Sequence, residues 1–140
     1  MSGMKAVLRV RISERDAHYG GKLAPGAKAL ELFGDIATEL AIRHDGDEGL
    51  LAGYERVELK APVHGGDFLE VTGEIVNVGK SSRTIEFRAV KYIATRPDVD
   101  ESAADLLTAP VLVATARGTT VVKTDRQRVP RPAGAGGIPP

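Results

Sequence analysis

Apolar and polar side chains alternate along residues 6–12 of the chain. Leu8, Val10 and Ile12 share one face, and the arginines between them fall on the other. A period of two residues is typical of a strand with one buried face. We therefore predict a first strand here, followed by a connection rich in glycine and proline over residues 15–26.

The next segment, residues 27–46, has the period of a helix. Apolar residues recur at steps of three and four positions and form one stripe: Ala29, Leu30, Phe33, Ala37, Leu40 and Ala41. Arg43 and His44 suit the negative end of a helix dipole, and Gly46 suits the position after the last turn. A helix of about eighteen residues is roughly 27 Å long, enough to cross a small sheet.

Strand patterns dominate the rest of the chain after an acidic turn. They cover residues 54–63, 67–79, 82–96 and 109–123. The short segments 65–67 and 79–82 suit hairpin connections, and residues 96–110 predict a turn or a short helix. We interpret residues 1–128 as one domain and the Pro/Gly-rich residues 129–140 as a flexible tail.

One strand, one long helix and several long strands predict an α+β fold, in which a curved antiparallel sheet wraps around one central helix. An open sheet of this kind has unpaired edges. Pairing two subunits edge to edge protects them, so we expect a homodimer or a higher homo-oligomer.

Composition narrows the class of function. The chain has 140 residues, no cysteine, and 19 basic against 19 acidic residues. This balance argues against nucleic acid as a partner, and no segment has the length of apolar residues that a signal peptide or a membrane span requires. The missing thiols and the absence of an HExxH-type spacing favour a protein without a metal. We expect a cytoplasmic protein with no membrane partner.

The sequence of residues 57–90 resembles the strand sequences of acyl-CoA enzymes with the hotdog fold. It has an Ala-Pro-Val step, a Gly-Asp turn, a strand, a Gly-Lys-Ser-Ser turn and another strand. The general resemblance spans residues 6–124 and implies the fold. It does not choose a reaction, because hotdog proteins include thioesterases, dehydratases, hydratases and binding proteins.

A narrower resemblance covers residues 9–50, 54–71 and 102–119 and extends over nearly the whole chain. These segments resemble the 3-aminobutyryl-CoA ammonia-lyases of lysine fermentation, relatives of β-alanyl-CoA ammonia-lyase. The resemblance implies reversible elimination of ammonia from L-3-aminobutyryl-CoA to give crotonyl-CoA. It also implies that no cofactor is used, since CoA is part of the acyl-CoA thioester substrate. Two alternatives stay open: an acyl-CoA thioesterase and a non-catalytic acyl-CoA-binding protein.

Such an elimination needs a base for the α-proton, donors for the thioester oxygen and an environment for a cationic amine. Gly20 and Gly21 precede the helix, and their backbone N–H groups can approach a thioester closely. The resemblance assigns them this role. The alternative is that they only turn the chain into the helix.

Asp35 is our first choice of base, because the helix of hotdog thioesterases carries a catalytic acid near its middle and FGDIATE aligns Asp35 with it. Glu31, Asp35 and Glu39 share one helical face at steps of four. If this face opens onto a cleft between two subunits, Glu39 would help to hold an ammonium group. For Glu31 we prefer an ordinary solvated position.

The loop before the helix supplies further candidates. Asp16 stands where the resembled thioesterases commonly carry Asn, which favours a site for a cationic substrate and makes Asp16 the second choice of base. His18 is either a proton relay or a structural histidine, with Asp35 its expected partner. We expect Tyr19 to pack over the helix start. Glu86 faces opposite to its apolar neighbours and is either on the solvent side or a substrate residue.

The turn of Lys80, Ser81, Ser82 and Arg83 offers two cations and two hydroxyls for the phosphates of CoA. A basic hairpin tip is otherwise just a soluble turn. In the family that the chain resembles this loop lies near CoA, and we therefore expect CoA binding here. The active sites are expected at the subunit interface.

Overall fold

The structure is a computed structural model that describes residues 3–129. The elements in chain order are β1 (Lys5–Arg11), η1 (Gly20–Lys22), α1 (Ala27–Asp45), β2 (Leu50–Leu59), β3 (Phe68–Val78), β4 (Ser82–Thr95), β5 (Ala104–Val121) and η2 (Thr124–Arg126). The predicted first strand, long helix and later strands all form, with shifted ends. The tail predicted over residues 129–140 lies outside the described residues apart from its first residue.

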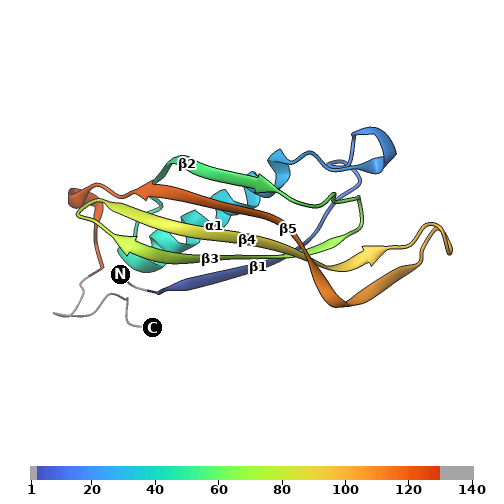
Figure 1. Ribbon diagram of the computed structural model, residues 1–140. Helices are drawn as coiled ribbons and strands as arrows, with labels where there is room; N and C mark the ends of the chain where they lie inside the picture. The colour runs from blue at the N-terminus through green and yellow to red at the C-terminus, as the bar shows by residue number, and fades with distance from the viewer. Residues whose placement is uncertain (1–2, 130–140) are drawn as a thin grey trace.

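The five strands form one antiparallel sheet in the order β1-β3-β4-β5-β2. The sheet is strongly curved, and α1 lies against one of its faces (Figure 1). This is the α+β arrangement that the strand and helix patterns predict, and it is the hotdog fold that the resemblance implies. The edge strands β1 and β2 are far apart in the sheet, each with one side that no strand within residues 3–129 covers.

The core lies between α1 and the sheet. Phe33, Ile36 and Leu40 are at most 1% exposed and face the middle strands. The Phe33 ring stacks on that of Phe87, with 5.0 Å between the ring centroids. A Cβ at Gly73 would lie 2.4 Å from the Ile36 side chain, so the helix crosses β3 where only glycine fits. Burying each such apolar side chain stabilises the fold by roughly 1.5–3 kcal/mol.

One predicted connection is wrong, and another, residues 96–110, begins with the turn that was one of its two expected forms. Residues 65–67 do not form a hairpin, because β2 lies at the edge beside β5 whereas β3 pairs with β1 and β4. The chain between β2 and β3 must therefore cross the end of the sheet. Residues 96–110 contain no helix: a turn ends before Ala104, where β5 begins. The predicted turn at residues 79–82 does join β3 to β4.

Gly46 ends α1 as predicted. Its φ of 75° is in the left-handed region, and its N–H donates to the Ile42 carbonyl at 2.8 Å. No helix in residues 3–129 is both long enough and apolar enough to cross a membrane.

Candidate active site

A buried carboxylate shapes the crossing connection between β2 and β3. Asp67 is 1% exposed and accepts hydrogen bonds from the backbone N–H groups of His64, at 2.7 Å, and Thr95, at 3.0 Å. Its Oδ2 also lies 3.5 Å from the Lys91 ammonium group. These contacts hold residues 60–67 across the end of the sheet, above the start of α1. The Gly-Asp turn thus has a structural task that its sequence alone did not reveal.

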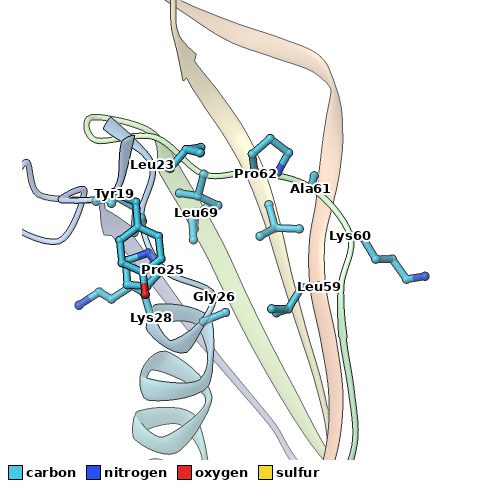
Figure 2. Close-up of a pocket in the computed structure, with 15 residues that line it drawn as sticks. Tyr19, Leu23, Pro25, Gly26, Lys28, Leu59, Lys60, Ala61, Pro62 and Leu69 are labelled. Atoms are coloured by element: carbon cyan, nitrogen blue, oxygen red, sulfur yellow. The ribbon is translucent and has the colours of Figure 1, made fainter. Parts of the chain in front are cut away.

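A cavity of about 390 Å³ lies beneath this connection. Its walls are the loop before α1, the first turn of α1 and residues 59–63 (Figure 2). Its floor consists of buried apolar side chains: Ile12, Ala29, Val63, Leu69 and Val113. Tyr19, Lys28 and Lys60 line it where the chain is more exposed. Both the size and the apolar lining are those of a small-molecule site.

The N-terminus of α1 opens at this cavity. Gly26 occupies the N-cap position without a side-chain cap, and a Cβ there would lie 2.4 Å from Leu59 Cδ1. The N–H groups of Lys28 and Ala29 donate to the carbonyls of Pro25 and Gly26. Within residues 3–129 the N–H groups of Gly26 and Ala27 have no acceptor. Together with the helix dipole they form a place for a carbonyl oxygen or an anion.

Lys28 links the preceding loop to the helix. Its Nζ lies 3.1 Å from Asp16 Oδ2 and 2.7 Å from Glu31 Oε1. The hydrogen bond from Lys28 lowers the pKa of Asp16 below its ordinary value, and the hydrogen bond to Glu31 raises the pKa of Lys28. Ser13 Oγ donates a further bond to Asp16. Asp16 therefore lies next to the cavity as a fixed, ionised carboxylate.

Asp35 and Glu39 lie further along α1. Glu39 accepts a hydrogen bond from Arg43 Nε at 2.8 Å, whereas the exposed Asp35 has no hydrogen bond or ion pair among the described residues. Carboxylates at steps of four on one helical face repel one another, and the cationic partners of Glu31 and Glu39 relieve this repulsion. Asp35 lies about 12 Å along the helix axis from Ala27, at 1.5 Å per residue. That distance separates it from the cavity of its own chain.

Three of the remaining loop candidates, His18, Gly20 and Gly21, lie outside the cavity lining. Gly20 and Gly21 are exposed in η1, and no atom would crowd a Cβ at either position. Gly21 has a φ of 74°, so the need for glycine there comes from the turn. His18 is exposed, with its ring edge-on to Tyr19 at 5.0 Å between centroids. Tyr19 itself lines the cavity, near the helix start, as predicted (Figure 2).

Two predicted site residues require correction. Arg83 is fully buried and donates from Nε and NH2 to Asp45 at 2.9 Å, so it is not available to the phosphates of CoA. Glu86 lies on the sheet face opposite α1, beside Arg56 at 3.5 Å and Arg117 at 3.3 Å, because its neighbours on β4 face the core. The Arg117 contact is an ion pair without hydrogen-bond geometry. The sheet separates Glu86 from the cavity.

The other members of the predicted CoA turn lie at the far end of the molecule from the cavity. Lys80 is exposed, and Ser81 and Ser82 are half-buried, near the C-terminal end of α1 (Figure 1). Leu69 in the cavity floor is eleven residues earlier along β3, which is roughly 35 Å of extended strand. This turn cannot contact a ligand held in the same chain's cavity.

Sequence reasoning missed Gly26, Lys28 and Leu59. The Pro25-Gly26 step directly before the helical pattern was a signal for Gly26, since proline and glycine there mark the helix start. For Lys28 and Leu59 no local pattern exists. Their roles depend on contacts with Asp16 and Gly26 that only the folded chain forms.

No protein-family model matches the chain. It is 53% identical over 125 residues to the 3-aminobutyryl-CoA ammonia lyase of Acetoanaerobium sticklandii, covering 89% of this chain and 99% of that protein. Among solved structures it is similar to the β-alanyl-CoA:ammonia lyase of Clostridium propionicum, with a TM-score of 0.89, 38% identity, and 97% and 96% of the two chains covered. A hexameric hotdog-fold thioesterase of Campylobacter jejuni is more distant, with a TM-score of 0.69, 19% identity, and 88% and 86% of the two chains covered.

Proposed function

The chain belongs to the hotdog-fold family of ammonia lyases that includes 3-aminobutyryl-CoA ammonia lyase, and on this basis we propose that it is a carbon–nitrogen lyase acting on a β-aminoacyl-CoA. The reaction is the reversible elimination of ammonia from L-3-aminobutyryl-CoA to give crotonyl-CoA. The observation that carries the proposal is the 53% identity over 99% of the curated relative. The open helix N-terminus above an apolar cavity provides the matching chemistry.

The thioester carbonyl is placed at the N–H groups of Gly26 and Ala27. Charge develops on this oxygen as the α-proton leaves, and fixed donors at a helix N-terminus stabilise it. The carboxylate base takes the α-proton, the electron pair forms the Cα–Cβ double bond, and the C–N bond breaks to release ammonia. These two N–H groups replace Gly20 and Gly21 in the role that we expected from the sequence.

Asp35 is proposed as the base, supplied by a second subunit. Its separation of about 12 Å from Ala27 prevents it from serving its own cavity. The free edge of β2 supports assembly, because Val57 is 40% exposed and Leu59 59% exposed on a strand that should have a buried face. We propose a homo-oligomer in which β2 edges pair and the active sites lie at the interface.

We assign roles that support the base to Asp16, His18 and Glu39. Asp16 stays ionised beside the cavity and favours the cationic amine, since Lys28 holds its carboxylate in place. His18 and Glu39 remain candidates for proton relay and ammonium binding. CoA contacts from Lys80, Ser81 and Ser82 would have to come from another subunit. That the reaction uses no cofactor and no metal, and takes place in the cytoplasm, stays a prediction.

The test mixes crotonyl-CoA, ammonium and purified protein. A lyase consumes the enoyl-thioester absorbance while the thioester bond stays intact, and the loss depends on ammonium. A thioesterase releases CoA thiol at a rate that ammonium does not change, and this result would overturn the proposal. A binding protein does neither.

A further inference from the structure

The cavity is larger than a four-carbon acyl group requires. Its volume of about 390 Å³ holds about thirteen water-sized groups at about 30 Å³ each. A 3-aminobutyryl group has about six non-hydrogen atoms, counted from its carbonyl carbon, and so fills about half of that space. The remaining space must suit some other part of the ligand.

The chemistry of the floor decides which part. Its five side chains are apolar, and three of the backbone carbonyls around it already accept hydrogen bonds. The Val63 carbonyl accepts from Ala24 N–H at 2.8 Å, and the Val113 carbonyl accepts from Lys60 N–H at 2.7 Å. The Ile12 carbonyl likewise accepts a bond from the backbone, at 2.7 Å. An amide of the pantetheine arm or an ammonium group would lose its water here without a replacement, which is unfavourable.

An alkyl chain has no such cost. With the thioester carbonyl at Gly26 and Ala27, the arm and the amine have to stay toward the exposed side, where Tyr19 and Lys28 lie. The substituent on the β-carbon then points to Leu69 and Val113. The labelled Leu23, Leu59 and Leu69 also line the cavity, from different segments of the chain (Figure 2).

We infer that the cavity is an alkyl pocket, and that the enzyme accepts β-aminoacyl-CoA and 2-enoyl-CoA thioesters of six to eight carbons as well as those of four. The inference rests on the proposed function for its catalytic part. Its binding part concerns the cavity alone.

Binding is measured first, by titration calorimetry with butyryl-, hexanoyl- and octanoyl-CoA, which cannot be aminated. Each methylene buried in the pocket raises affinity about fourfold, which corresponds to about 0.8 kcal/mol. Hexanoyl-CoA should therefore bind more than tenfold more tightly than butyryl-CoA. Affinity that stays constant or falls with chain length would overturn the inference.

Activity is measured second, with 2-hexenoyl-CoA and ammonium compared with crotonyl-CoA. We expect kcat/KM for the six-carbon substrate at least equal to that for crotonyl-CoA. If neither substrate reacts but affinity rises with chain length, the proposed function fails and the alkyl pocket stands. If crotonyl-CoA reacts and the longer chain neither reacts nor binds better, the function stands and the pocket assignment fails.

A variant ties the effect to this cavity. Ala61 lines it from the crossing connection and is only partly buried, so Ala61→Leu fills space without changing the core. The variant should lose the preference for hexanoyl-CoA, so that its affinities for hexanoyl-CoA and butyryl-CoA agree within about threefold. The matched control is Ala104→Leu, at an exposed position of β5 outside the cavity lining. An unchanged chain-length preference in a folded Ala61→Leu protein would contradict the inference, and if this variant fails to fold the wild-type series decides alone.

Discussion

Asp35 differs from its two acidic neighbours on α1 in its surroundings. Glu31 and Glu39 are tied to Lys28 and Arg43, whereas the Asp35 carboxylate is exposed and forms no ion pair within residues 3–129. Water solvates this exposed carboxylate, so no contact among the described residues occupies it. The position therefore allows a role toward a ligand or a second subunit.

We predict that Asp35→Asn lowers kcat by about 10²–10⁴-fold, the usual contribution of a general base. Binding of butyryl-CoA should change by less than about threefold, because Asn has nearly the same size. Ammonium addition to crotonyl-CoA and calorimetry measure the two quantities. Glu31→Gln, one turn away at an exposed position of the same face, is the matched control and should keep most of the activity. Equal losses in both variants would show that Asp35 is not the base.

Asp16 is a weak base for a physical reason. The Lys28 hydrogen bond lowers its pKa below 3.8, while an efficient base has a pKa near the working pH. Asp16→Asn should therefore reduce kcat much less than Asp35→Asn and should raise the KM for ammonium. The depressed pKa keeps Asp16 ionised at all higher pH. A fall in rate on the acid side of the pH–rate profile above about pH 5 must then come from another group, and it must remain in the Asp16→Asn variant. Its disappearance would identify Asp16 as the titrating base.

The sequence predicted the secondary-structure elements better than it predicted the connections between them. The alternation at Leu8, Val10 and Ile12 and the apolar stripe of α1 arise from local periods that burial on one side imposes. The crossing connection was not predictable in this way, because short glycine-rich segments serve hairpins and crossings alike. Only the pairing of β2 with β5 distinguishes the two cases.

The two edge strands differ in how they are protected. On β1 the exposed Val7 stands beside Arg9, which forms a salt bridge with Glu70. On β2 the exposed Val57 and Leu59 belong to a strand with a free side. Charged side chains discourage edge pairing, but both strands carry them, on β2 the ion-paired Glu55 and Arg56; the exposed apolar side chains, which favour pairing, are more numerous on β2. The fold thus marks β2 as the edge for assembly.

We predict that Val57→Asp dissociates the oligomer and abolishes turnover, because a charge would be buried between paired edges and the shared site would come apart. Light scattering after gel filtration measures the mass, and circular dichroism reports whether the subunit stays folded. Val7→Asp introduces the same charge on the other edge strand and should leave mass and activity unchanged. A Val57→Asp protein of full oligomer mass would exclude β2 as the interface.

The fold brings together residues that are far apart in the sequence. Gly26 meets Leu59 across 33 positions of chain, and Arg83 meets Asp45 across 38. The residue types in the site were visible in the sequence, but their grouping was not. This explains why Arg83 looked like a ligand for phosphate: an arginine in a Ser-rich turn has the same local pattern whether it points outward or, as here, into the protein.

The Arg83–Asp45 pair joins three parts of the molecule. Asp45 ends α1, Arg83 begins β4, and the Asp45 carbonyl accepts a hydrogen bond from Arg128 N–H at 2.8 Å after the last strand. Burial raises the pKa of Asp45, but hydrogen bonds from Arg83 and His44 more than offset this, so its pKa lies below 3.8. A depressed pKa stabilises the fold above the pKa of the unfolded chain. That stabilisation is lost as the pH falls through the folded value.

We predict that Arg83→Met lowers the free energy of unfolding by about 3–5 kcal/mol at neutral pH, because it leaves a buried carboxylate without its cation. Without the arginine, burial raises the pKa of Asp45, so the variant gains from protonation as the pH falls. The stability difference from the wild type should therefore narrow below about pH 5. Urea unfolding at several pH values measures it. Arg88→Met, at an exposed position of the same strand, should cost less than about 0.5 kcal/mol at any pH. A difference that does not depend on pH would show that the pair is not the source of the stability.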